Sequence, residues 1–308
     1  MARSMILRRF VLLPLLLALA CTAPNARQNV ASANGGAAWA AACEDFDEWD
    51  KPGPPFRIHG NSWYVGTCGI AAVLVTGGQG HVLIDGGTEK GASIIAQNIR
   101  RLGFRLRDVK LLLHSHEHFD HVGGLSSLQR LTGARLVASQ EAAPVLSTGR
   151  DGAGDPQAGM HPPFAAARVD AVLGADGQAS LGALRLTAVP TPGHTPGALT
   201  WQWQSCASGN RDCRWIVYAD SLNPISSDSY RFSAHPAYVA AFRAGLERLS
   251  TLNCDILLTP HPGSSDMRKR LLSPRGLAEA GGCRAYAAMI RERLDARLAK
   301  EVGPAPHD

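Results

Sequence analysis

Apolar runs separated by polar clusters divide the chain into short strands and helices from residue 63 onward. Aliphatic runs that stop at a polar cluster are typical of buried strands, whereas apolar residues at helical spacing are typical of amphipathic helices. The first pattern predicts strands over 63–65, 70–75, 82–84, 109–113, 135–138, 184–189, 199–204, 215–219 and 256–259. The second predicts helices over 93–102, 125–131, 235–249 and 283–300. Strands and helices in this order predict an α/β layered domain.

The N-terminal pattern is different and indicates a signal peptide over residues 1–20. Three arginines form a basic n-region, residues 10–19 form an apolar h-region, and Ala18-Leu19-Ala20 is a small-x-small cleavage site. This apolar run is short for a bilayer span, so we expect no transmembrane helix. We therefore predict export to the periplasm. Cys21 follows the cleavage site directly, which leaves a lipid anchor there, and hence an outer-membrane lipoprotein, as an alternative.

The rest of the chain divides into a tether and one domain. Residues 21–42 are mostly Ala, Gly, Asn and Ser, with little to bury, and predict a flexible tether. Residues 43–308 are long enough for a single domain with a sizeable core, which we expect to be monomeric. Loss of residues 1–20 removes three arginines and no acid, so the formal charge falls from +5 to +2. With no basic patch left, the composition argues against a nucleic-acid partner.

Cysteine usage agrees with export. Besides Cys21 there are six cysteines, namely Cys43, Cys68, Cys206, Cys213, Cys254 and Cys283. None forms a C-x-x-C pair, which argues against a thiolate zinc site, and an even number in an exported chain favours disulfides. Six cysteines allow fifteen pairings. Cys206 and Cys213 flank a turn-rich link between two predicted strands and could cross-brace a hairpin.

The strongest chemical signal is the stretch His114-Ser115-His116-Glu117-His118-Phe119-Asp120-His121, which follows a predicted strand. Because alternate side chains of an extended loop share a face, His116 and His118 can reach one cation. Asp120 and His121 are neighbours that diverge, so they suit a second cation beside the first. Imidazoles combined with one carboxylate favour zinc.

His114 continues the histidine series, and a shifted register would make it a ligand. Asp120 and His121 occupy the last two positions of the His-x-His-x-Asp-His pattern only if the pattern begins at His116. We therefore expect His114 to end the strand or to support a ligand residue without binding the metal itself. The inverted zincin pattern His114-x-x-Glu117-His118 would need a helix, and no helix start signal precedes it.

Other predicted strands also end at a His or an Asp. His194 lies in Pro190-Thr191-Pro192-Gly193-His194-Thr195-Pro196-Gly197, a turn that its prolines and glycines make rigid. His261 lies between two prolines, and Asp220-Ser221 follows a strand. Loops at one edge of a sheet converge, so these residues can join the 114–121 stretch. A polar loop over 149–163, which contains Gln157, is of the kind that borders a site.

These stretches, in this order from about residue 60 to about residue 300, resemble the metallo-β-lactamase superfamily. Its hydrolases share an αββα sandwich, so the resemblance implies this fold in a single domain. The segments at 63–69, 115–121 and 218–221 are similar to the third subclass of class B β-lactamases. The first two subclasses have a zinc-binding Cys where Ser221 stands, so Ser221 is not expected to be a direct ligand.

The resemblance also implies roles for individual side chains. It implies two zinc ions per chain, one on His116, His118 and His194 and the other on Asp120, His121 and His261. It places three polar side chains near the substrate, namely Gln157, Ser221 and Asn223. It implies three disulfides, namely Cys43–Cys68, Cys206–Cys213 and Cys254–Cys283.

The implied activity is that of a zinc-dependent β-lactamase, a source of antibiotic resistance. It would hydrolyse the β-lactam amide of penicillins, cephalosporins and carbapenems through a zinc-bound hydroxide, because metal binding lowers the pKa of water from about 15.7 to about 7. Asp120 would ligate and orient the hydroxide and assist proton delivery to the leaving nitrogen. No Ser or Cys nucleophile is required, so no acyl-enzyme is expected.

The main rival is a secreted metallo-hydrolase of the same fold that acts on thioesters or lactones, as glyoxalase-type enzymes do. In those enzymes a bridging aspartate sits near the Asp220 position. The sequence leaves open whether Asp220 faces the metals. Export and the low charge disfavour an RNA-processing role. A complete set of six ligands disfavours a secreted metal-binding module without activity.

Overall fold

A computed structural model describes residues 1, 35–152, 154–207 and 211–302. Apart from Met1, the predicted signal peptide lies outside these residues, as do Cys21 and the tether up to residue 34. No helix in the described ranges is both long and apolar enough to cross a membrane.

The first sheet has seven strands in the described chain, and neighbours in the sheet are also neighbours in sequence. The strands are β1 (Phe56–His59), β2 (Ser62–Tyr64), β3 (Val73–Gly77), β4 (Gly80–Ile84), β5 (Val109–Leu113), β6 (Arg135–Ala138) and β7 (Val169–Val172). The first four pair antiparallel, and β4 to β7 pair parallel. The parallel strands therefore end at the same edge of the sheet.

The second sheet has five strands in the order β12, β11, β10, β9, β8 within the described residues. The strands are β8 (Gln178–Leu181), β9 (Leu184–Pro190), β10 (Leu199–Ala207), β11 (Arg211–Tyr218) and β12 (Ile256–Leu258). β11 and β12 pair parallel, so the chain leaves both strands at one edge. All other pairs of this sheet are antiparallel.

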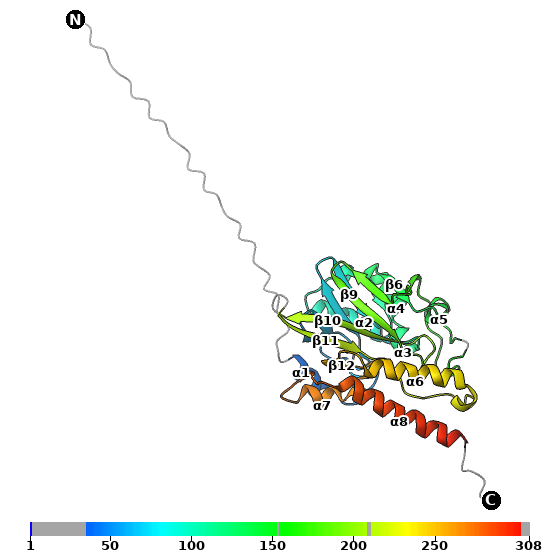
Figure 1. The fold of residues 1–308 in the computed structure, drawn as a ribbon. Coiled ribbons are helices and arrows are strands. Elements are labelled where there is room, and N and C mark those ends of the chain that lie inside the picture. The colour runs from blue at the N-terminus through cyan, green and yellow to red at the C-terminus, as the bar shows by residue number, and fades with distance from the viewer. Residues whose placement is uncertain (2–34, 153, 208–210, 303–308) are drawn as a thin grey trace, which may run out of the picture.

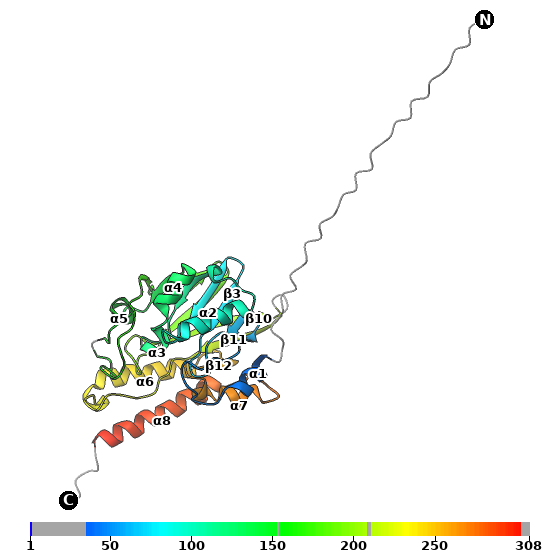
Figure 2. The same cartoon turned by 180° about the vertical axis from the view of Figure 1, so that it is seen from behind.

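The helices lie outside the two sheets, in two groups (Figures 1 and 2). The longer helices are α2 (Gly91–Arg101), α4 (Leu125–Thr132), α5 (Ala142–Thr148), α6 (Pro236–Ser250) and α8 (Gly282–Val302). The shorter elements are α1 (Gly35–Ala42), α3 (Phe119–Val122), α7 (Met267–Leu271), η1 (Leu106–Asp108), η2 (Phe232–Ala234) and η3 (Pro262–Ser265). Helices α2 and α4 cover the first sheet, and α6 and α8 lie side by side on the second.

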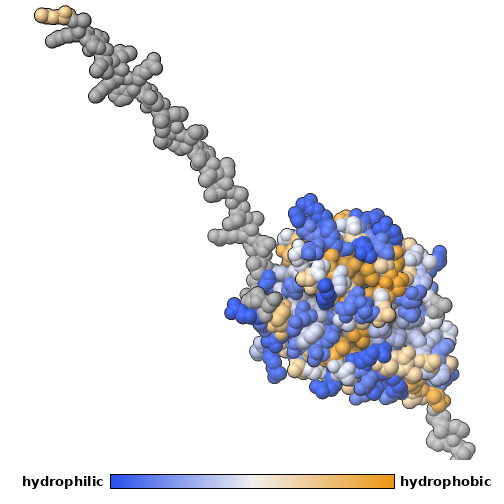
Figure 3. Space-filling model, turned by 45° about the horizontal axis from the view of Figure 1, so that its top comes forward, coloured by the Kyte–Doolittle hydropathy of each residue, from blue (hydrophilic) through white to orange (hydrophobic). Residues whose placement is uncertain are grey.

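Three buried clusters fill the spaces between these layers. Side chains that alternate along the strands, such as Val82 and Ile84, pack between the sheets, while Leu83 points to the helices. Trp201 and Trp203 are the largest side chains from β10 in the space between the sheets. The predicted αββα sandwich is therefore confirmed. The face in Figure 3 is largely hydrophilic, with smaller apolar areas.

The sequence patterns located the core strands better than the strands near the sheet edges. The predicted bounds of β5 and β6 agree with the structure, and the predicted strand 70–75 begins only at Val73. Strands β1, β7 and β8 and helices α1, α5 and α7 were not predicted. Short elements of this kind carry too few residues for a periodic pattern to emerge.

The prediction of a flexible tether over 21–42 is wrong for residues 35–42, which form α1. Trp39 of this helix is completely buried and packs against Phe56 and Tyr64. Five of the eight residues of α1 are alanines, the strongest helix former, so the composition that suggested a tether also favours a helix. Trp39 stabilises the helix against the domain, because burial of its side chain offsets the entropic cost of ordering the segment.

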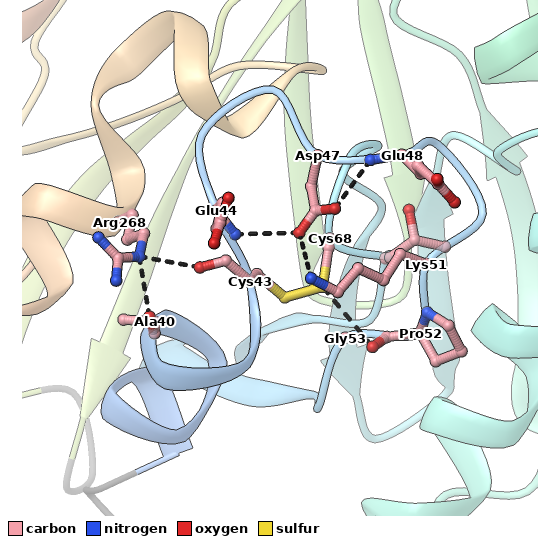
Figure 4. The surroundings of a disulfide bond; sticks show 12 residues. Ala40, Cys43, Glu44, Asp47, Glu48, Lys51, Pro52, Gly53, Cys68 and Arg268 are labelled. Atoms are coloured by element: carbon pink, nitrogen blue, oxygen red, sulfur yellow. Dashed lines mark hydrogen bonds and ion pairs between the residues drawn. A yellow bond between two sulfur atoms is a disulfide. The ribbon is translucent and has the colours of Figure 1, made fainter.

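The end of α1 is tied to the domain by polar and covalent contacts (Figure 4). The Arg268 side chain donates from Nε to the carbonyls of Ala40 (2.9 Å) and Cys43 (2.8 Å), which the helix leaves without partners. Cys43 is bonded to Cys68. The other predicted disulfides, Cys206–Cys213 and Cys254–Cys283, are also present, so all three pairings are confirmed.

We predict that Trp39→Ala lowers the free energy of unfolding by about 3–5 kcal/mol, because it removes a buried aromatic side chain. Urea unfolding of the metal-loaded protein measures this change. Phe46→Ala is the matched control, since Phe46 is 74% exposed and its loss should change stability little. Equal stability of the Trp39 variant and the wild type would mean that α1 does not belong to the domain.

Candidate metal centre

Six of the predicted residues come together at the edge where the strands end. His116 and His118 follow β5 and precede α3, which carries Asp120 and His121. His194 lies in the turn after β9, and His261 follows β12. His116, His118 and His194 present donor atoms that all lie within 4.8 Å of one another, and so do His116, Asp120 and His121. His116 belongs to both sets, and its ring centroid lies 4.2 Å from that of His121. The first donor group, His116, His118 and His194, therefore adjoins a second group that contains Asp120 and His121.

The second group is completed by His261. Its Nε2 lies 3.3 Å from Nε2 of His121 and 3.4 Å from Oδ2 of Asp120, and the latter two atoms are 2.9 Å apart. Ligands on a tetrahedral zinc ion with bonds of about 2.0–2.1 Å lie about 3.3–3.4 Å from each other. The three donor atoms are thus spaced as ligands of one small divalent cation would be.

Each ring of the first group has one nitrogen held from behind. Nδ1 of His116 lies 2.8 Å from Oδ1 of Asp220, and both side chains are fully buried. Nε2 of His118 lies 3.1 Å from Oδ2 of Asp155, and Nδ1 of His194 donates to the Asn223 carbonyl at 2.8 Å. Such contacts fix the ring orientation and direct the opposite nitrogen to the metal.

The rings of the second group also have polar neighbours on one side, although the contact of His121 is longer than those of the first group. Nδ1 of His121 faces Oδ2 of Asp85 at 3.7 Å, and the backbone of Gly69 forms a hydrogen bond with the ring of His261. Asp85 is itself fixed, because its carboxylate accepts hydrogen bonds from Ser115 (2.6 and 2.7 Å) and from the Tyr218 hydroxyl (2.7 Å). Its φ of +66° is unusual for a residue with a side chain. A conformation of this kind costs about 1–3 kcal/mol and persists where surrounding contacts hold it.

The protonation states of several of these groups suit a metal. Burial lowers the pKa of His116 and His194 well below the ordinary value, and that of His261 to about 4, so these imidazoles are neutral near pH 7. Burial opposes ionisation of Asp120, but the neighbouring His121 outweighs it and holds the pKa of this carboxyl well below its usual range. Neutral imidazoles and ionised carboxylates are the forms that bind cations.

His118 and His121 differ from the other rings. Burial lowers the pKa of each, but Asp155 beside His118 and Asp120 beside His121 outweigh it, so both pKa values are raised. A metal would therefore displace a proton from these two rings. Burial raises the pKa of Asp220 to about 8, which favours its neutral form in the absence of a cation.

A direct test of fit is the set of buried polar atoms that lack a partner. Nε2 of His116 is buried and neither accepts nor donates a hydrogen bond among the described residues. An unpaired buried polar atom is costly, and a cation at these groups would remove part of that cost. The donor set therefore fits a divalent metal.

The remaining residues of the 114–121 stretch face other parts of the fold. His114 accepts a hydrogen bond from the Ser139 backbone at Nε2, and Trp201 donates to its carbonyl, so it ends the strand as expected. The carboxylate of Glu117 accepts hydrogen bonds from Thr195 and Gly197.

Two of the three residues predicted near the substrate contact His194, Gln157 through its side chain and Asn223 through its backbone carbonyl. The amide nitrogen of Gln157 is 3.4 Å from both ring nitrogens of His194. The hydroxyl of Ser221 is buried and has no hydrogen-bond partner among the described residues. The Asn223 side chain accepts a hydrogen bond of 2.5 Å from Arg293 of α8.

Comparison with known proteins identifies the family. Residues 65–206 match the model of the metallo-β-lactamase superfamily. The solved structure of the MIM-2 metallo-β-lactamase is 56% identical, covers 87% of this chain and 98% of its own, and superposes with a TM-score of 0.83. The chain belongs to the metallo-β-lactamase family. MEM-A1, a subclass B3 metallo-β-lactamase from a soil metagenome library, is 40% identical, with coverage of 84% and 100% and a TM-score of 0.78. Membership agrees with the resemblance seen in the motifs.

A more distant relative has a different activity. The hydroxyacylglutathione hydrolase of Anaeromyxobacter dehalogenans (strain 2CP-C) is 29% identical over 196 residues. The match spans 63% of this chain and 62% of that relative, so it extends over less than two thirds of either protein. The family therefore includes hydrolases of more than one substrate class among the relatives of this chain.

Sequence patterns missed two of the side chains that support the rings. Asp155 lies in the loop 149–163, in which only Gln157 was singled out, and Asp85 ends β4. Asp85 had a usable signal, because it follows a buried strand as Asp220 does. Asp155 had none, since acidic residues are common in polar loops.

We predict that Asp155→Asn weakens metal binding at the first group about 10–100-fold, the usual effect of removing a carboxylate that holds a ligand histidine. Competition with a chromophoric chelator measures the dissociation constants. Asp176→Asn is the control, because Asp176 is exposed and bonds only the backbone of Gln178. Unchanged affinity in the Asp155 variant would show that this contact does not direct His118 to a metal.

Proposed function

We propose that this protein is a zinc-dependent β-lactamase that hydrolyses the amide bond of penicillins, cephalosporins and carbapenems. The observation that carries this proposal is the pair of adjoining donor groups, made only of His and Asp, with Ser221 and not a cysteine beside them. Similarity to MIM-2 and to a subclass B3 enzyme over nearly the whole of each solved chain supports it.

Two zinc ions are the cofactors of this proposal. His116, His118 and His194 would hold one of them, and Asp120, His121 and His261 would hold the other. When bound, zinc supplies Lewis acidity that polarises a carbonyl and lowers the pKa of coordinated water from about 15.7 to about 7.

The side chains of the protein orient the reaction and handle the proton. Asp120 is 3% exposed and ionised, so its carboxylate can orient the attacking water, accept a proton at Oδ1 and return it to the nitrogen that leaves the lactam ring. The unpaired Ser221 hydroxyl can donate to the substrate carboxylate, and Gln157 and Asn223 can bind the substrate carboxylate or carbonyl. No Ser or Cys nucleophile takes part, so no acyl-enzyme forms.

Thioester or lactone hydrolysis is the second candidate, favoured by the similarity to hydroxyacylglutathione hydrolase. The orientation of Asp220 weighs against it. Oδ1 of Asp220 lies behind His116, and Oδ2 accepts a hydrogen bond from the Leu222 backbone at 3.2 Å. In this position Asp220 contacts a proposed ligand, and it belongs to neither of the two donor groups found among the described residues.

We also propose that the chain is exported to the periplasm as a monomer, with residues 1–20 removed. The three disulfides support export, because such bonds persist in oxidising compartments. The mass of the mature protein distinguishes a plain N-terminus from a lipid anchor at Cys21, and an uncleaved cytoplasmic chain would contradict export.

We predict that the purified zinc-loaded protein hydrolyses a chromogenic cephalosporin, that a chelator abolishes turnover, and that added zinc restores it. Absorbance at the wavelength of the opened product measures the rate. Parallel assays with a glutathione thioester and an acyl lactone test the second candidate. Turnover of a thioester or a lactone without turnover of any β-lactam would overturn the proposal.

The variant Asp120→Asn extends this assay. It retains a ligand oxygen but cannot accept the proton, so kcat/KM should fall about 100- to 10,000-fold. Zinc content must be measured in the same samples, so that lost metal is not mistaken for lost proton transfer. Full activity with full zinc content would remove Asp120 from the catalytic role.

A further inference from the structure

Glu117 is a buried acid to which the proposed reaction gives no role. It is 4% exposed and lies in sequence between two proposed ligands, His116 and His118, but its carboxylate accepts hydrogen bonds from a different loop. Among the described residues it takes part in no ion pair with a Lys, Arg or His side chain. A buried carboxylate without such a partner is costly, so its retention requires a compensating contact.

The strongest compensating contacts are two hydrogen bonds from the turn that carries His194. The Thr195 hydroxyl donates to Oε2 of Glu117 at 2.6 Å, and the Gly197 backbone N–H donates to Oε1 at 2.8 Å. Hydrogen bonds to an ionised acceptor are the strong ones in proteins. Both donors follow His194 by no more than three residues, so the carboxylate fixes the chain immediately beyond this ring.

The His194 turn and the 114–121 stretch approach each other so closely that a side chain at residue 197 would not fit. A Cβ atom on Gly197 would lie 2.8 Å from Oε2 of Glu117 and 2.7 Å from the Ala142 nitrogen. The Gly197 carbonyl is also held, since it accepts a hydrogen bond of 2.8 Å from the Ser139 hydroxyl. Only glycine permits this close approach at position 197. The contact fixes the position of the His194 turn relative to the 114–121 stretch.

This contact joins the two loops that supply the first donor group. His116 and His118 come from one loop and His194 from the other, and a metal site needs all three held in advance. Displacement of the His194 turn would move one ring out of three. The second group does not depend on it, because Asp120, His121 and His261 lie on α3 and after β12.

We propose that Glu117 is a positioning residue that fixes His194 against His116 and His118 and thereby sets the affinity of this group for its metal ion. The proposal rests on the proposed function only in that these three histidines bind a metal. Two effects contribute. The hydrogen bonds hold the geometry, and the buried negative charge attracts a cation close by.

Substitutions separate these effects. Glu117→Gln can keep both contacts, because its carbonyl can accept from Gly197 and its amide can donate to the Thr195 oxygen, yet it carries no charge. Glu117→Ala removes contacts and charge together. Thr195→Val removes one donor at nearly constant volume, and Thr195→Ser keeps the hydroxyl and should restore wild-type behaviour. Glu89→Gln is the matched control, since Glu89 is exposed.

The readout is the pair of stepwise zinc dissociation constants, measured by chelator competition on each folded variant, with cobalt(II) spectra to identify the group that is lost. His194→Ala provides the reference spectrum for loss of the first group. We expect Glu117→Ala to weaken one zinc ion about 10–100-fold and to leave the other within about threefold. Glu117→Gln and Thr195→Val should lie between Glu117→Ala and the wild type.

The thermal midpoint of the zinc-free protein separates positioning from general support of the fold. A purely structural role would lower this midpoint and weaken both zinc ions alike, which would overturn the proposal. Wild-type constants in both Glu117→Ala and Thr195→Val would also overturn it. If Glu117→Ala does not fold, Thr195→Val decides. Failure of the wild type to bind zinc at the first group would instead refute the proposed function, and this inference with it.

Discussion

The site depends on one constraint, which is that four buried imidazole rings, the partly buried ring of His261 and a buried carboxylate lie beside one another with few hydrogen-bond partners for their donor atoms. Burial of such groups is unfavourable without a partner. Their neighbours hold the far side of each ring, through Asp220, Asp155, Asp85 and two backbone groups. These contacts restrain the rings, so they cannot turn to find other hydrogen-bond partners. A divalent cation is the partner that fits the arrangement.

The sandwich provides this arrangement because parallel strands end at a common edge. β4 and β5 deliver Asp85 and the histidine stretch from one sheet, and β11 and β12 deliver Asp220 and His261 from the other. The apolar layers between the sheets hold these strand ends in register. Stability and function thus share one origin, since a shift of either sheet would separate the two halves of the site.

Sequence patterns could predict the parts of this site that are encoded locally. The run from His116 to His121 and the prolines beside His194 and His261 predict candidate metal ligands without a structure, and the fold brings these residues together. Two of the supporting side chains, Asp155 and Glu117, could not be found in this way, because they differ from ordinary loop acids only through contacts with residues far away in sequence. The same limit explains α1, where a segment rich in alanine and glycine was interpreted as a tether although Trp39 belongs to the core.

Asp220 shows how a single orientation separates reactions on one fold. A carboxylate that bridges two metals and one that supports a histidine can occupy the same position in sequence. Here Oδ1 of Asp220 lies 2.8 Å from Nδ1 of His116, and Oδ2 accepts a hydrogen bond from the Leu222 backbone. The next residue, Ser221, is left with a buried hydroxyl free of partners among the described residues. The proposed function assigns this hydroxyl to the substrate, because a hydroxyl suits the carboxylate of a β-lactam better than it suits a metal.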